Sequence, residues 1–177
     1  MDQILDVIKK RRSICAYKNK LVSKNVIDSI LEAAKYAPTA RNLQELKYKV
    51  VTNRDLTRKI SERITTIVKQ KYPSIKMREG SNLFYDAPLL IIVTGPKENV
   101  WIYSDAAHAA QNIMLYATSI GLGTCFIGMA RFIEEDKELL QELHMSSESK
   151  IAAAVICGHP DEEPAEKEKK ITVEFFN

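Results

Sequence analysis

Apolar positions in the N-terminal part of the chain recur at the three- and four-residue spacing of amphipathic helices. A helix is predicted in each of three segments, whose apolar positions are Ile4, Leu5 and Ile8; Val26, Ile27, Ile30, Leu31 and Ala34; and Leu56, Ile60, Ile64 and Val68. The second helix has a candidate N-cap at Ser23 and should end by Ala37, because the residue before Pro38 disfavours the helical conformation. The third helix should end before Pro73.

Further along the chain, strand patterns appear between helices. The run APLLIIVTG is continuously apolar, rich in branched side chains and bounded by Pro88 and Gly95, which predicts a strand buried on both faces. A long helix is predicted over SDAAHAAQNIMLYATSIG, capped at Ser104 or Asp105 and ended by Gly121. The other expected elements are a strand at KYKVVT (47–52), a strand or extended loop at TCFIGMA (124–130), a helix at EEDKELLQEL (134–143) and a buried strand at KIAAAVICG (150–158).

The C-terminal residues 161–177 are expected to form an extended arm on a single domain that spans residues 1–177. The segment DEEPAEKEKK is charged and contains proline, so it should lie in solvent or wrap a surface. In ITVEFF, Ile171, Val173 and Phe175 occupy alternate positions, which is the period of a strand. Such a strand either pairs with its own sheet or reaches a second subunit.

Composition and charge argue against several classes of protein. The chain has 26 basic and 23 acidic residues, and a net charge of +3 is too small and too interspersed for a nucleic-acid-binding surface. Cys15, Cys125 and Cys157 form no CxxC pair, which argues against a disulfide framework or zinc site and favours a reducing compartment. The N-terminus lacks the pattern of a secretory signal, and the apolar run is too short to span a bilayer. We therefore expect a cytoplasmic protein without membrane association.

The common catalytic motifs have no match in the sequence. His108, His144 and His159 are isolated from one another, so no metal site is expected. The sequence contains neither a GxSxG nucleophile motif nor a Walker lysine, and its glycine-rich GLGTCFIG follows a helix, unlike a dinucleotide fingerprint. An enzyme built from this chain would therefore take its reactivity from an organic cofactor.

The segment KKRRS offers a site for an anionic group. The guanidinium groups of Arg11 and Arg12 and the hydroxyl of Ser13 suit a phosphate, because they present several donors to its oxygens. The alternative is that these cations only complement the C-terminus of the first helix. Taken alone, the segment favours this plainer interpretation.

Two other segments offer groups for a planar ring. In APTARNLQ, the amides of Asn42 and Gln44 can pair with a ring that has both donors and acceptors, such as a flavin pyrimidine; the alternative is a polar turn. In GLGTCFIG, glycines let backbone N–H groups approach a planar ligand, or they only end a helix and lead into a strand. Here too the plainer interpretation is favoured for each segment alone.

Taken together and in this order, the segments resemble the FMN-dependent nitroreductase family. The pattern is RRSIxxY, LEAAKYAPTARNLQ, DAAHAAQNIMLYATSIGLGTCFIG and AAAVICGHPDEEP, and it covers essentially the whole chain. The resemblance implies an α+β fold, with a mixed central β-sheet flanked by helices, in an intertwined homodimer that exchanges its C-terminal strand. FMN would lie at the subunit interface. The small residues at the dimer centre would be Ala106, Ala107, Ala109 and Ala110, unless they only pack within one subunit.

The resemblance also implies which residues bind the cofactor. They are Arg11, Arg12 and Ser13 at the phosphate and ribityl chain; Thr39, Asn42 and Gln44, from the second subunit, against the isoalloxazine ring; Ile127 and Gly128 near flavin N5; and Lys167 and Lys169, in the arm, at the phosphate. The family usually has arginine at the place of Lys169, and lysine keeps the charge but loses bidentate geometry. No side chain is expected to be catalytic in itself, because FMN carries the chemistry.

Two positions depart from the family pattern. Cys15 stands where the family commonly has a basic residue near the pyrimidine end of the ring. A cation there stabilises the negative charge of reduced flavin, so its absence implies a lower flavin potential or weaker binding unless Arg41 replaces it. The alternative is that Cys15 only fills space. The second departure is Glu45 and Leu46 in place of Pro and Trp, which makes inherited substrate preferences unreliable.

The implied activity is a ping-pong transfer of reducing equivalents from NADH or NADPH, through FMN, to a small acceptor such as a nitroaromatic or quinone. The alternatives are flavin reduction or other reductive chemistry on the same scaffold, and a non-catalytic FMN-binding or redox-sensing protein. No acidic or basic ribose reader in the sequence selects between NADH and NADPH, and a ferredoxin-type donor is a further alternative. A short lid is expected over residues 73–86.

Overall fold

Four antiparallel strands form the centre of the protein in a computed structural model that describes residues 3–76 and 82–176. Their order across the sheet is β1 (Lys47–Val51), β2 (Leu89–Pro96), β4 (Ser149–Gly158) and β3 (Gly123–Phe126). Beside β3, Ser13 and Thr124 form an isolated bridge in the parallel sense. This bridge brings the N-terminal basic segment to the edge of the sheet.

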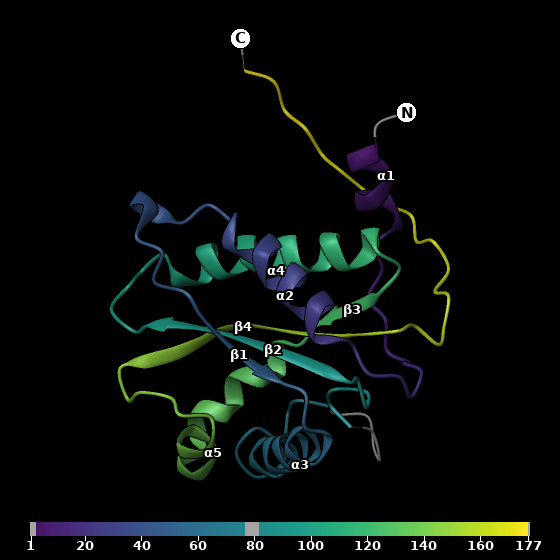
Figure 1. Cartoon of the computed structure of the whole chain (residues 1–177). Coiled ribbons are helices and arrows are strands. Elements are labelled where there is room, and N and C mark those ends of the chain that lie inside the picture. Colours follow the sequence, from purple (N-terminus) through teal and green to yellow (C-terminus); the bar gives the residue numbers. More distant parts are fainter. Residues whose placement is uncertain (1–2, 77–81, 177) are drawn as a thin grey trace.

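Helices cover both faces of the sheet (Figure 1). One face carries α2 (Lys24–Lys35) and α4 (Ile102–Ser119), and the other carries α3 (Arg54–Lys71) and α5 (Lys137–Glu142). The short α1 (Gln3–Lys10) contacts α4. Two 3₁₀ segments, η1 (Ala40–Asn42) and η2 (Gly128–Glu135), complete the described elements. The predicted α+β arrangement is thus confirmed.

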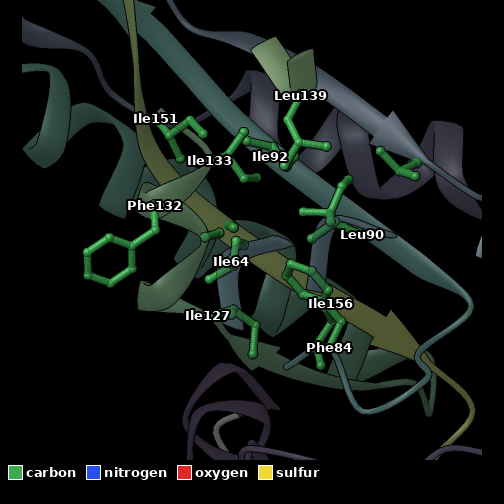
Figure 2. Packing of buried hydrophobic residues seen from close by; sticks show 14 of the residues in the cluster. Ile64, Phe84, Leu90, Ile92, Ile127, Phe132, Ile133, Leu139, Ile151 and Ile156 are labelled. Carbon is green, nitrogen blue, oxygen red and sulfur yellow. The ribbon is translucent and has the colours of Figure 1, made fainter. Parts of the chain in front are cut away.

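Strand β2 is buried on both faces, as its uninterrupted apolar sequence predicts. Leu90 and Ile92 pack into the core on the α3 side, which Figure 2 shows together with Phe84 and Ile64. Leu89, Ile91 and Val93 pack into the second core, under α2 and α4. Burying each such side chain contributes roughly 1.5–3 kcal/mol, so this strand fixes the register of both layers.

The start of α4 differs from the prediction. The helix begins at Ile102, and the predicted cap at Ser104 or Asp105 is wrong. The turn before it is closed by Asn99, whose side-chain oxygen accepts a hydrogen bond from the Trp101 N–H at 2.8 Å. Asp105 has a different role, because its carboxylate accepts a hydrogen bond from the backbone N–H of Ala40. Gly121, with φ of 79°, follows the end of the helix as predicted.

The other boundaries follow the predictions closely, with three qualifications. The helix predicted at 134–143 is divided between the end of η2 and α5, which begins at Lys137. Ser23 occupies the N-cap position of α2, but its side chain makes no capping hydrogen bond. The segment TCFIGMA divides between β3 and η2. Part of the predicted lid, residues 77–81, lies outside the described residues. No described helix has both the length and the apolar character needed to cross a bilayer.

Residues 161–176 form no helix or strand and leave the body of the protein beside α1 (Figure 1). The segment ITVEFF does not pair with its own sheet, and Ile171 and Phe175 are 87% and 86% exposed. Of the small residues on α4, Ala106, Ala109 and Ala110 are buried within the chain, whereas Ala107 is exposed. Packing within one chain therefore accounts for three of these four alanines.

Candidate functional site

A cavity of about 600 Å³ lies between the end of α1, the start of β3 and the C-terminal arm. Lys10 and Arg12 line it from one side, Gly121 and Gly123 from another, and Glu166 from the arm. The basic residues are there because α1 ends at Lys10 and the chain continues along β3. The cavity thus holds two cations, but the carboxylates of Glu162, Glu163 and Glu166 also line it, so its lining is mixed in charge.

Arg12 has one donor that the protein leaves unused. One terminal nitrogen donates to the carbonyl oxygens of Lys9 and Arg11, the latter at 3.0 Å. The other lies 3.5 Å from the carboxylate of Glu166, whose side chain is 76% exposed, so this ion pair is weak. The Nε atom is buried and has no acceptor among the described residues. A buried, unpaired N–H of a cation is costly unless a ligand accepts from it.

The segment around Ser13 is held tightly against β3. Ile14 N–H donates to the Thr124 carbonyl at 2.9 Å, next to the bridge between Ser13 and Thr124. A Cβ atom on Gly123 would lie 2.7 Å from Cγ1 of Ile14, so only glycine permits this approach. Gly123, the first residue of β3, therefore allows the RRS segment to pack against the GTCFIG segment.

The arm reaches this site with acidic groups. The carboxylate of Glu162 accepts hydrogen bonds from the backbone N–H groups of Cys15 and, at 3.1 Å, Ala16. Lys167 and Lys169 are exposed on the arm and do not line the cavity. Within one chain, the predicted basic pair therefore stays apart from Arg12.

The predicted ring-binding amides lie in a second cavity, of about 460 Å³. It is lined by the end of α2 and by Thr39, Asn42, Gln44 and Tyr48. None of the residues lining the Arg12 cavity contributes to this one. A single chain therefore does not bring the two predicted groups of site residues together.

The loop that carries these amides has an unusual backbone. Arg41, Asn42 and Gln44 all have positive φ, of 54°, 55° and 54°, a conformation that is uncommon outside glycine. The Gln44 N–H donates to the hydroxyl oxygen of Thr39 at 3.2 Å. Several such residues in one loop store strain that the surrounding structure must hold, a feature that clusters at ligand-binding sites.

Two contacts from the start of α4 hold the loop. The buried carboxylate of Asp105 accepts from the Ala40 N–H at 2.9 Å. The side-chain amide of Asn99 donates to the carboxylate of Glu45 at 2.8 Å. Sequence reasoning missed Asp105, which it interpreted as a helix cap. It also missed the hydrogen bond from Asn99 to Glu45, which is one of the two residues that depart from the family pattern.

Ile127 and Gly128, the residues predicted to lie near flavin N5, stand at the start of η2. Ile127 is buried, whereas Gly128 is exposed and has open space where a side chain would be. Burial and, to a smaller extent, the adjacent Cys15 raise the pKa of the nearby Cys125 thiol to about 11. Tyr17 donates to the Ile14 carbonyl at 2.7 Å, and burial also raises its pKa. Cys125 sits among the predicted site residues although the sequence offered no signal for it.

The chain combines a cavity that holds a buried, unpaired guanidinium N–H with a strained amide loop, on a sheet with helices on both faces. These features suit a protein that binds a planar cofactor with an anionic group. The profile of the Nitroreductase family matches residues 8–159, so the chain belongs to this family.

Individual proteins agree with this assignment. A protein of Methanothermobacter thermautotrophicus, provisionally named NADH dehydrogenase/NAD(P)H nitroreductase, is 32% identical over 171 residues, covering 93% of this chain and 81% of the relative. The crystal structure of a nitroreductase with bound FMN from Bacteroides fragilis is 28% identical, with a TM-score of 0.87 and coverage of 100% and 98% of the two chains. An FMN-dependent nitroreductase from Clostridium difficile is 31% identical, with a TM-score of 0.77 and coverage of 97% and 99%.

Proposed function

We propose that this protein is an FMN-dependent oxidoreductase that takes reducing equivalents from NADH or NADPH and passes them to a small acceptor. The observation that carries the proposal is the unpaired, buried Nε of Arg12, in a cavity that Lys10 and two glycines line together with carboxylates of the arm. Such a donor matches the phosphate of FMN. Family membership and the FMN bound in the Bacteroides fragilis relative support the same cofactor.

The residues present fit the phosphate end of FMN. Arg12 offers a preorganised guanidinium whose weak pairing with the exposed Glu166 a phosphate can replace. Lys10 adds a second cation, and Arg11 and Ser13 lie on the same segment. In this proposal Lys167 and Lys169 turn toward the phosphate when the arm is ordered.

The ring end of the site requires a second chain. The amide loop with Thr39, Asn42 and Gln44 lies in a different cavity from Arg12, as expected if each complete site takes its two halves from two subunits. Strand β1 pairs on one side with β2, and its other edge has no strand partner among the described residues. We assign that edge to the partner's ITVEFF strand, whose alternate side chains are exposed in the single chain. The proposed unit is therefore a homodimer with an exchanged C-terminal strand.

When bound, FMN supplies the chemistry, since its N5 position accepts a hydride and its reduced form reduces an acceptor such as a nitroaromatic or a quinone. The chain's own residues orient the ring and exclude water. In this proposal Gly128, which has open space where a side chain would be, would leave room beside the ring, and Ile127 and the strained loop would wall it. A single open face makes donor and acceptor bind in turn.

Flavin itself is a second candidate acceptor. A Bacillus subtilis relative named FMN reductase [NAD(P)H] is 24% identical over 189 residues, covering 94% of this chain and 70% of the relative. The two activities differ in whether FMN leaves the protein as product. Steady-state kinetics with added free FMN as the varied acceptor separates them, because a flavin reductase saturates with free FMN.

The test of the proposal is a visible spectrum of the purified protein with FMN, before and after anaerobic addition of NADH and then NADPH. We expect a flavin spectrum that bleaches with one or both nucleotides and recovers with a nitroaromatic or quinone. Flavin that stays oxidised with both nucleotides would indicate a binding protein or another donor. A protein that does not bind FMN would reject the proposal.

A matched pair of variants isolates the phosphate contact. Arg12→Ala should weaken FMN binding by at least about tenfold, since a charged hydrogen bond is worth about 1.5–3 kcal/mol. Riboflavin lacks the phosphate, so its affinity should hardly change. Arg58→Ala, which removes an exposed arginine paired with Asp86 far from the cavity, serves as the control. An equal loss for FMN and riboflavin would show that Arg12 acts only on folding.

A further inference from the structure

Two of the three cysteines lie on the two chain segments that border the candidate site. Cys15 follows the RRS segment and Cys125 lies on β3, and the bridge between Ser13 and Thr124 holds these two stretches side by side. Both thiols are free, and Cys15 lies close enough to Cys125 to raise the pKa of its thiol. Cys157 is fully buried on the neighbouring strand β4, opposite Thr124 in the register.

The two thiols differ in exposure and surroundings. Cys15 is exposed, so a reagent in solution reaches it first, whereas Cys125 is partly buried. Burial raises the pKa of Cys125 to about 11, although the polar side chain of Ser13 and the charge of Arg11 favour the thiolate. The exposed Cys15 can therefore attack an external disulfide, and the nearby Cys125 can resolve the mixed disulfide once its thiol ionises.

We propose that Cys15 and Cys125 form a reversible disulfide that closes across the candidate flavin site. The oxidant is a low-molecular-weight disulfide of the glutathione class. The Cys15 thiolate attacks one sulfur of the oxidant, which breaks the S–S bond and releases one thiolate product. The Cys125 thiolate then attacks the sulfur of Cys15, which releases the second thiolate product and leaves the intramolecular disulfide. Two protein thiols are oxidised and one external disulfide is reduced to two thiols, which take up the two protons that the protein thiols lose.

The disulfide would act on cofactor binding. Cys15 lies at the position that resemblance places near the pyrimidine end of the ring, and Cys125 is followed closely by Ile127 and Gly128. Bound FMN therefore shields Cys15 and slows disulfide closure, and closure weakens FMN binding by the same coupling free energy. This coupling rests on the proposed function, whereas formation of the disulfide does not.

The experiment treats the reduced full-length protein, with and without FMN, with oxidised glutathione. Free thiols are counted after denaturation, and the bridged peptides are identified by mass spectrometry. We expect wild type without FMN to lose two of its three thiols and to yield a Cys15–Cys125 peptide. Cys125→Ser should stop at a glutathione adduct on Cys15, Cys15→Ser should react much more slowly, and the matched control Cys157→Ser should behave as wild type.

The pH dependence of the rate of disulfide closure tests whether Cys125 is the resolving thiol. The closing step should accelerate by about tenfold per pH unit from neutral pH toward 10, because the resolving thiol must ionise and its pKa is about 11. FMN at saturating concentration should slow closure by at least about tenfold, and the closed form should bind FMN correspondingly more weakly.

Several outcomes would overturn the proposal. Retention of all three thiols, a stable glutathione adduct on Cys15 in wild type, or a bridge that includes Cys157 would each reject the pair. Closure at equal rates with and without FMN, in protein shown to bind FMN, would reject the coupling. Protein that forms the disulfide but does not bind FMN would reject the proposed function and leave the redox pair intact.

Discussion

The carboxylate of Asp105 accepts a hydrogen bond from the backbone N–H of Ala40 at 2.9 Å, and thereby ties the amide loop to the start of α4. Asp105 is 4% exposed, and the N–H that its carboxylate binds begins a loop in which Arg41, Asn42 and Gln44 have positive φ. A charge-assisted hydrogen bond is worth about 1.5–3 kcal/mol, enough to hold a strained turn. Asp105 is thus a positioning residue for the proposed ring-binding amides.

Replacing Asp105 by Ala should release this loop. We expect the affinity for FMN to fall by at least about tenfold, which corresponds to about 1.4 kcal/mol, because Asn42 and Gln44 no longer hold their orientation. Asp105→Asn keeps an oxygen that can accept from Ala40 and should retain most of the affinity. Fluorescence titration with FMN and riboflavin measures the effect, which should be equal for the two ligands because it concerns the ring. Asp105→Ala protein that binds both like wild type would show that the loop holds itself.

Substitutions at two glycines should distinguish an effect on ligand binding from an effect on folding. A Cβ atom at Gly128 meets nothing within 4 Å, and Gly128→Ala should therefore unfold at nearly the wild-type denaturant concentration. The same methyl group would intrude on a flavin ring at the proposed position, so FMN affinity and the rate of flavin reduction by NADH or NADPH should fall.

Gly123→Ala is the complementary variant, because its Cβ would collide with Ile14 at 2.7 Å. It should lose stability by roughly 1–3 kcal/mol from overpacking, measured by urea unfolding without ligand. A Gly128→Ala protein with unchanged FMN binding and flavin reduction would place the ring elsewhere.

Much of the fold could be predicted from local sequence, and the limits of that prediction have a physical cause. The apolar run of β2 predicts a buried strand and the apolar periodicity of α3 predicts a helix. Both elements form where they are expected. The role of Asp105 could not be predicted, because it depends on a contact with Ala40 across 65 positions. The proximity of Cys125 to Cys15 likewise depends on the pairing of distant segments. The assembly of Arg12 with Asn42 and Gln44 depends on a second chain and stays a prediction.

An ion pair on the opposite face of the sheet should make stability depend on pH. Desolvation alone would raise the pKa of Asp136, but hydrogen bonds from Arg63 and from the N–H groups of Leu139 and Glu138 outweigh it and hold this pKa below its ordinary value. The carboxylate therefore stabilises the fold above its unfolded pKa of about 3.9, and this stability is lost as the pH falls through the lower folded pKa.

Asp136→Asn should consequently lower the free energy of unfolding by about 1–3 kcal/mol at pH 7, since asparagine keeps the helix cap but loses the charge. The difference from wild type should shrink as the pH falls below about 4. Urea unfolding at a series of pH values measures it, with Glu138→Gln as the control because its side chain is 72% exposed. A difference that is independent of pH would indicate that packing, not charge, is the cause.

The exposed C-terminal strand should control assembly. Val173 lies on the apolar face of ITVEFF, and Val173→Asp would place a charge against the partner's sheet in the proposed dimer. The loss of an apolar contact and the burial of a charge together cost about 3 kcal/mol or more, so the dimer should dissociate at least about 100-fold more readily. Thr172→Asp puts the same charge on the other face of the strand and should leave the dimer nearly intact.

Sedimentation equilibrium at several concentrations measures this assembly, and the FMN content of the same samples should fall together with the dimer fraction. The proposed interface site makes this correlation necessary, because Arg12 and the amide loop lie in separate cavities of one chain. A monomeric Val173→Asp protein that keeps full FMN affinity would contradict a site shared between subunits. A wild-type protein that is monomeric at micromolar concentration would contradict strand exchange itself.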